Sequence, residues 1–183
     1  MIIAPRPQIQ AKAKRRTAPT QDALTAAVNP QAQSRAQVLR HFRSVFNAVK
    51  SHFHHVEKHA GIGGAQVWAL STIETRPAIG MSDLASMLDI HQTTASNLVK
   101  GLLKAGLVRA EKNGPDKRTV QLHILETGRA VLQKVPAPFS GVLPKALSAL
   151  DAKTLARLEQ DLGKLLALLN VDPNAAKTPL ASL

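Results

Sequence analysis

Residues 82–105 read SDLASMLDIHQTTASNLVKGLLKA, and this stretch decides the fold. Its first part predicts a short helix capped by Ser82, and its second part predicts a longer helix that begins near Gln92. Apolar residues recur at helical spacing and predict the inward faces of both helices: Leu84, Ala85 and Leu88 on the first, and Ala95, Leu98, Val99, Leu102 and Leu103 on the second. A short helix, a tight turn and a longer helix form a helix-turn-helix.

The outward face of the longer helix is polar at its beginning and cationic toward its end. We expect this face to lie in the major groove of duplex DNA, where the first helical turns meet base edges and cations meet phosphates. The residues expected to contact DNA are Gln92, Thr93, Thr94, Ser96, Asn97, Lys100 and Lys104. Taken alone, residues 82–105 fit an ordinary helical hairpin with a solvated polar face equally well.

The residues that follow favour the first interpretation. LVRAEKNGPDKRTVQLHIL predicts two strands joined by dense turn chemistry, at residues 107–112 and 119–124. A hairpin directly after the recognition helix is a wing, and a basic wing tip can enter an adjacent minor groove. We expect Lys117 and Arg118 to contact DNA there, and Asp116 to orient a cation by a charge-assisted hydrogen bond.

Two apolar stripes flank this region. Apolar residues recur three and four apart between residues 39 and 56, and again between residues 155 and 169. Asn29 followed by Pro30 predicts the start of the first helix, and Asp151 is a candidate N-cap for the last. Two such stripes exceed what one small core needs, so we expect both helices to pack against a partner subunit. An intrachain bundle would show the same periodicity.

This arrangement resembles the MarR family of bacterial transcription regulators. The resemblance covers about residues 38–169 and is carried by four motifs in order: LASMLDI, TTASNLVKGLLKAGLV, PDKR and ETGRAVL. It implies a mainly α fold with a small β-hairpin wing, a winged helix-turn-helix with long N- and C-terminal dimerisation helices. It also implies a homodimeric repressor of a near-palindromic operator. A small molecule bound between the dimer helices and the DNA-binding lobe would usually release the double-stranded DNA.

The sequence departs from the family pattern within these motifs. Asn97 stands where Arg is common and Lys100-Gly101 where Asp-Arg is common, so base preference does not carry over. Gly101 costs a helix interior about 1 kcal/mol relative to Ala and allows close backbone approach. Ala110 replaces a family Arg, which leaves the pairing of Asp116 open, and Leu125 replaces a Thr, which weakens the cap of the next helix.

Composition limits the class of protein. The chain has 183 residues, 3% aromatic residues, no Cys and a formal net charge of +12. The absence of Cys excludes disulfides and thiolate metal sites. So few aromatic residues, with so much Ala and Leu, make an all-β fold unfavourable. The charge indicates a polyanionic partner, either nucleic acid or an anionic membrane surface.

We divide the chain into three parts. Residues 1–29 are basic and poor in large apolar residues, which predicts a disordered tail. Residues 30–171 form the winged helix-turn-helix domain, and residues 172–183 a flexible C-terminal tail. Within the domain we expect a DNA-binding lobe at 62–126 and dimerisation helices at 30–60 and 127–170. No apolar run suits a membrane span or a secretory signal, so we expect a cytoplasmic, nucleoid-associated protein without a membrane partner.

Four of the seven histidines lie in SHFHHVEKH, residues 51–59. His52, His55 and His59 are spaced three and four apart, and imidazoles so spaced can chelate Zn²⁺, Cu²⁺ or Ni²⁺. A metal-responsive regulator is therefore the alternative hypothesis, with the metal unknown. A polar helix face that covers apolar surface is the interpretation we favour, and a pH-responsive cluster is a third. Trp68 could line an effector pocket, although a lone Trp is more often a core residue.

An enzyme is the rival from another class. The segment His55-Val56-Glu57-Lys58-His59 lacks the His-Glu-x-x-His spacing of zinc peptidases. The glycines at 61–64 do not follow a strand, so they predict a flexible connection and not a dinucleotide site. We therefore expect no catalytic residues and no required cofactor, and a small-molecule effector of unknown identity.

Overall fold

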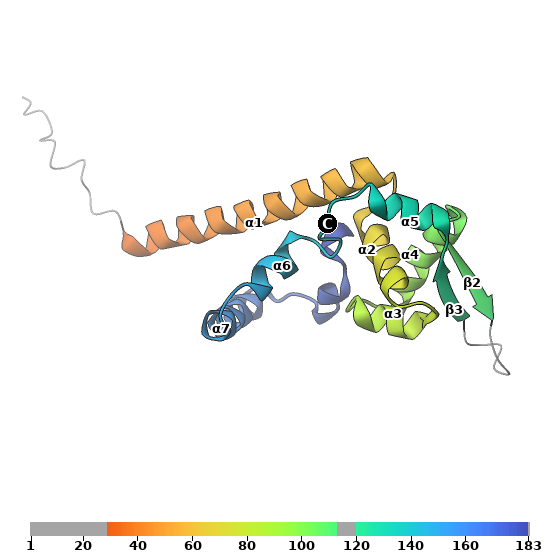
Figure 1. The fold of residues 1–183 in the computed structure, drawn as a ribbon. Helices are drawn as coiled ribbons and strands as arrows, with labels where there is room; N and C mark the ends of the chain where they lie inside the picture. Colours follow the sequence, from red (N-terminus) through yellow and green to blue (C-terminus); the bar gives the residue numbers. More distant parts are fainter. Residues whose placement is uncertain (1–28, 113–119, 183) are drawn as a thin grey trace, which may run out of the picture. The chain divides into compact units, whose positions relative to one another are not determined.

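The structure, a computed structural model, describes residues 29–112 and 120–182. The chain divides into two compact units, Met1–Arg40 and His41–Leu183. The described part is mainly helical, with one small sheet (Figure 1). Its elements are α1 (Pro30–Ala60), α2 (Gly64–Thr75), β1 (Ile79–Gly80), α3 (Met81–Met87), α4 (Gln92–Lys104), β2 (Val108–Lys112), β3 (Val120–Ile124), α5 (Glu126–Gln133), α6 (Val142–Ser148), α7 (Ala152–Leu169) and the 3₁₀ turns η2 (Pro173–Lys177) and η3 (Leu180–Ser182).

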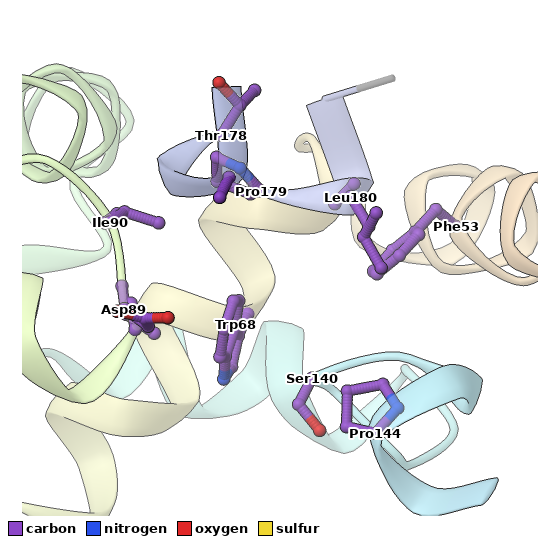
Figure 2. Close-up of a pocket in the computed structure, with 12 residues that line it drawn as sticks. Phe53, Trp68, Asp89, Ile90, Ser140, Pro144, Thr178, Pro179 and Leu180 are labelled. Carbon is purple, nitrogen blue, oxygen red and sulfur yellow. The ribbon is translucent and has the colours of Figure 1, made fainter. Parts of the chain in front are cut away.

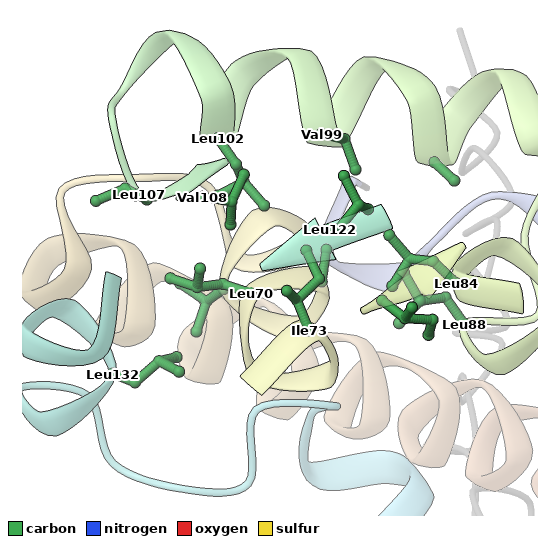
Figure 3. Packing of buried hydrophobic residues seen from close by; sticks show 14 of the residues in the cluster. Leu70, Ile73, Leu84, Leu88, Val99, Leu102, Leu107, Val108, Leu122 and Leu132 are labelled. Atoms are coloured by element: carbon green, nitrogen blue, oxygen red, sulfur yellow. The ribbon is translucent and has the colours of Figure 1, made fainter. Parts of the chain in front are cut away.

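The core of the second unit is built around α2. This helix packs against α3, α4, α5 and β3, and its apolar side chains are fully buried: Val67, Ala69, Leu70 and Ile73. Figure 3 shows Leu70 and Ile73 of α2 converging with Leu122 of β3 beneath α4. Removal of apolar surface from water is the main stabilising term here.

The predicted helix-turn-helix is present, with two corrections. Helix α3 begins at Met81 with Gly80 as its N-cap, and not at a Ser82 cap. The reason is that Gly80 pairs with Gln121 of β3, which holds its backbone extended until the helix starts. The predicted inward face of α4 is confirmed except at its edge, because Leu103 is 39% exposed. Leu103 lies about 100° around the helix from buried Leu102, which places it outside the packed face.

The sheet has three antiparallel strands in the order β1–β3–β2. Strands β2 and β3 are the predicted hairpin, and their register pairs Val108 with Ile124 and Lys112 with Val120. The turn between them, residues 113–119, lies outside the described residues. Strand β1 was not predicted, because two residues are too short to show alternation.

Helix α5 begins without a side-chain cap at Leu125, as predicted. Two other bonds tie this junction to the loop before β2. The Leu125 amide donates to the Leu107 carbonyl at 2.9 Å, and the Thr127 hydroxyl donates to the Gly106 carbonyl at 2.5 Å. Gly128 makes the contact possible, since a Cβ there would lie 2.4 Å from the Leu107 carbonyl oxygen.

Helix α7 has the predicted N-cap. The Asp151 carboxylate accepts hydrogen bonds from the Thr154 amide at 3.0 Å and the Thr154 hydroxyl at 2.7 Å. These bonds favour the charged form and lower the pKa of Asp151. No residue of α7 is buried within the described chain, and its exposed apolar side chains include Leu155, Leu158, Leu166, Leu168 and Leu169.

The stripe on α1 behaves differently along its length. Val49, Phe53 and Val56 are buried, so this part of the stripe belongs to the intrachain core. Leu39 and Phe46, earlier in the stripe, are exposed by 55% and 57%. Within the described ranges, no helix is both long and apolar enough to cross a membrane.

The C-terminal end differs from the expected flexible tail. Residues 173–177 and 180–182 form the two 3₁₀ turns, η3 packs on α2, and Pro179 is buried. Proline fixes φ and removes a donor, which suits such short turns. The composition of residues 172–183 alone does not predict that this segment packs on the core.

Gly128→Ala should lower the free energy of unfolding by about 1–3 kcal/mol, because the added methyl group overlaps a backbone oxygen that cannot move aside. Urea denaturation followed by circular dichroism would measure this loss. Gly163→Ala is the matched control, since a Cβ at Gly163 in α7 meets nothing within 4 Å. Equal stability of the two variants would contradict the packing described for α5.

Candidate nucleic-acid interface

One face of α4 is free of contacts with the core and carries polar and cationic side chains. Thr93, Asn97, Lys100 and Lys104 are all exposed. Their spacing of four, three and four residues places them in one stripe along the helix. The buried residues Ala95, Val99 and Leu102 lie on the opposite side.

The other predicted contact residues occupy the margins of this stripe. Thr94 and Ser96 are half-buried at its two edges. Gln92 is exposed in the first turn, where its side-chain amide donates to the Ser82 hydroxyl at 3.3 Å. The structure therefore places all seven predicted residues of α4 on the exposed face or its borders.

No described side chain pairs with the cations of this stripe. Within the described part of the chain, neither Lys100 nor Lys104 forms an ion pair. Acidic side chains are also absent from α4 itself, which reads QTTASNLVKGLLK. A helix face with hydrogen-bonding groups first and free cations next suits a polyanion.

Gly101 is explained by a neighbouring side chain that the sequence did not single out. A Cβ at Gly101 would lie 2.1 Å from Nε2 of Gln66, so the glycine admits the Gln66 amide onto the surface of α4. The Oε1 atom of the same side chain accepts a hydrogen bond from the Gly63 amide at 3.1 Å. Glu57 Oε1 accepts another from the Gly64 amide, also at 3.1 Å. These contacts fix the N-terminus of α2 against both α1 and the recognition helix.

The wing carries its own charged cluster on the face opposite Leu122. Arg109 and Glu111 form an ion pair on β2, and His123 Nε2 of β3 lies 3.4 Å from Glu111 Oε2. Arg109 is therefore partly neutralised. The predicted tip residues Asp116, Lys117 and Arg118 lie outside the described residues.

Comparison with known proteins shows which family this sequence resembles. The sequence model of the MarR family matches residues 60–119, which include α2, the helix-turn-helix and the first strand of the wing. Over this region the chain is similar to proteins of the MarR family. Over 115 residues, or 62% of this chain, it is 30% identical to the transcriptional repressor MprA of Escherichia coli K12. That match spans 65% of the relative's length, slightly less than two thirds.

Two solved structures have the same fold. A MepR-like protein complexed with pseudoligands gives a TM-score of 0.53 at 16% identity, covering 73% of this chain and 94% of that one. The S. aureus MepR–DNA complex gives 0.50 at 19% identity, covering 70% and 94%. These likenesses confirm the predicted winged helix fold class.

The three predicted histidines of α1 do not come together as one set of ligands, although the ring centroids of His55 and His59 lie 4.2 Å apart. His52 Nε2 lies 3.0 Å from the Pro138 carbonyl, whereas His59 Nδ1 lies 2.8 Å from the carbonyl of His55. Among the described residues, no group of three His, Asp or Glu side chains is placed to hold a metal ion. The structure thus gives the metal hypothesis no support.

Trp68 is half-buried and lines a cavity of about 170 Å³ (Figure 2). Phe53 of α1, Ile90 of the helix-turn-helix and Leu180 of η3 line the same cavity. Trp68 is thus both a core residue and a wall of the cavity, so the two interpretations of its sequence position are compatible.

Val99→Ala should lower the free energy of unfolding by about 2 kcal/mol, since Val99 is buried between α4 and the core. Asn97→Ala, two residues earlier on the exposed face, should change it by less than about 0.5 kcal/mol. Thermal denaturation of the two variants would test which face of α4 is inward. A larger loss for Asn97→Ala would reverse the assignment.

Proposed function

We propose that this protein is a transcriptional regulator of the MarR type that binds a near-palindromic operator sequence-specifically as a homodimer. The observation that carries the proposal is the exposed stripe Thr93, Asn97, Lys100 and Lys104 on a helix packed firmly against the core. The relative MprA is named a transcriptional repressor and the MepR structure a complex with DNA, which supports the same role here. The activity is binding, without a catalytic step.

The side chains of α4 divide by the chemistry that each offers. Asn97 can make a bidentate contact to adenine N6 and N7 in the major groove. Lys100 lies one turn further on and reaches either a guanine edge or a phosphate, while Lys104 reaches the phosphate backbone. Gln92 and Thr93 stand in the first turn near base edges. Thr94 and Ser96, at the edges of the stripe, suit phosphate contacts.

Sequence outside the described residues adds to this interface. Lys117 and Arg118 would contact the DNA flanking each half-site, with Asp116 orienting one of these cations. The basic N-terminal segment would add sequence-independent affinity by counterion release. Removing residues 1–28 would then flatten the salt dependence of binding without changing the preferred sequence.

The homodimer is supported by apolar surface that the single chain leaves uncovered. Leu155, Leu158 and Leu166 of α7 are exposed, as are Val45 and Phe46 of α1. A groove beside Val45 and Phe46, lined also by Leu143 of α6, has a volume of about 160 Å³. Apolar faces of this extent favour association with a partner.

Regulation by a small molecule is the second part of the proposal. The cavity beside Trp68 is adjacent to Ile90, two residues before α4 begins. A ligand bound there would touch the turn that orients the recognition helix. We infer that binding at this cavity changes the affinity for DNA, through the different contacts that the ligand makes in the bound and free conformations.

Asn97→Ala should weaken binding to the preferred site by about 1–3 kcal/mol and relax selection at one position in each half-site. Selection from a random duplex library at near-physiological salt would first define that site, and titration would then compare variants. Lys100→Ala should reduce affinity more evenly across sequences. If Asn97→Ala retains both affinity and sequence preference, α4 does not read bases through this residue.

Leu158→Asp together with Leu162→Asp should produce monomers or insoluble protein, because two charges would be buried in the partner contact. Sedimentation velocity would measure the oligomeric state. Gln160→Asp with Ala167→Asp is the matched control, since it adds the same charges to the opposite face of α7. A Leu158/Leu162 variant that stays dimeric and binds DNA tightly would refute dimerisation through this face.

A further inference from the structure

The chain does not end at the last long helix but returns to the core. Asn170, in the left-handed region at φ 48°, ends α7 and redirects the chain. Residues 172–182, here called the C-terminal strap, then form η2 and η3. Pro179 is buried. Ala181 lies close to α2, since a Cβ added at Gly64 would be 3.3 Å from the Cβ of Ala181.

The strap is also tied to the helix-turn-helix. Lys177 of the strap forms an ion pair with Asp89. Asp89 has a positive φ of 49° and lies in the turn between α3 and α4. Both partners are exposed, Asp89 by 81% and Lys177 by 45%. Exposed ion pairs are weak, so the strap is tethered to this turn by a contact that is easily exchanged.

The strap forms one side of the cavity beside Trp68 (Figure 2). Its contribution consists of Ala176, Thr178, Pro179, Leu180 and Ala181. Phe53, Trp68 and Ile90 supply apolar wall, and Asp89 is the charged residue in the described lining. Figure 2 shows the Asp89 carboxylate on the side toward Trp68.

We propose that the cavity binds a small aromatic cation, and that this cation takes the place of Lys177 at Asp89 and loosens the strap. The proposal rests on the proposed ligand-responsive function. A volume of about 170 Å³ suits a single ring, since an apolar cavity of about 150 Å³ can hold benzene. Aromatic faces attract cations, and Asp89 supplies the opposite charge.

Lys177 of the strap therefore competes with the ligand for Asp89. Lys177 offers Asp89 the same ammonium group that the ligand would bring, and the apolar turn η3 covers the ring site. Binding of the cation frees the turn at Asp89 from its tether to the end of the chain. The ligand thereby reaches the residues directly before the recognition helix.

The experiment uses the full chain and the fluorescence of Trp68, which is the only Trp in the sequence. The probes are phenethylammonium and phenylacetate, which share a ring and differ in charge. Phenethylammonium should change Trp68 emission at concentrations at least fivefold lower than phenylacetate. Hydrogen exchange of the strap should increase when phenethylammonium binds.

Three variants test the competition. Lys177→Gln should tighten phenethylammonium binding at least threefold, because the internal competitor is gone. Asp89→Asn should abolish the preference for the cation, and Asn tolerates the left-handed backbone at this position. Lys164→Gln is the matched control, since Lys164 forms the same kind of exposed ion pair with Asp161 on α7, at 3.0 Å. The Lys164→Gln variant should bind phenethylammonium as tightly as the unaltered protein does.

Equal responses to the two probes, or no response to either in the unaltered protein and in Lys177→Gln, would overturn the proposal. An unchanged affinity in Lys177→Gln would leave the strap as a structural anchor and would also overturn it. None of these readouts involves DNA. Failure to bind DNA would therefore count against the proposed function alone, while failure of the titrations would count against the strap.

Discussion

Enclosure of α2 by apolar contacts is the constraint on which the rest of this structure depends. Val67, Ala69, Leu70 and Ile73 are fully buried, and α3, α4, α5 and β3 all pack against the same helix. Interiors are packed as densely as organic crystals, so an element that contacts α2 has little freedom to shift. This packing sets the orientation of the recognition helix α4.

A few polar contacts refine what the apolar packing begins. The Gln66 side chain bonds to Gly63 and rests on α4 beside Gly101, while Glu57 of α1 accepts from the Gly64 amide. Together they connect a long outer helix, the start of the central helix and the recognition helix. Glycine at 101 is thus a requirement of packing, although it disfavours a helix interior.

The exposed surface divides into regions with different physical character. The α4 stripe is cationic and hydrogen-bonding, which suits a polyanion. The faces of α7 and of the middle of α1 are apolar and uncovered, which suits a second copy of the chain. The cavity beside Trp68 is lined on one side by the helix-turn-helix and on the other by the strap.

The sequence by itself determined the helix-turn-helix, the two strands of the wing and the inward faces of α3 and α4, because these depend on local periodicity and turn chemistry. It also determined which residues of α4 are exposed, with Leu103 as the exception at the border of the packed face. Only the tertiary structure decided the two-residue strand β1, the role of Gln66 against Gly101 and the return of residues 172–182 to the core. Each of these depends on residues distant in the chain meeting in space, which leaves no periodic signal in the sequence.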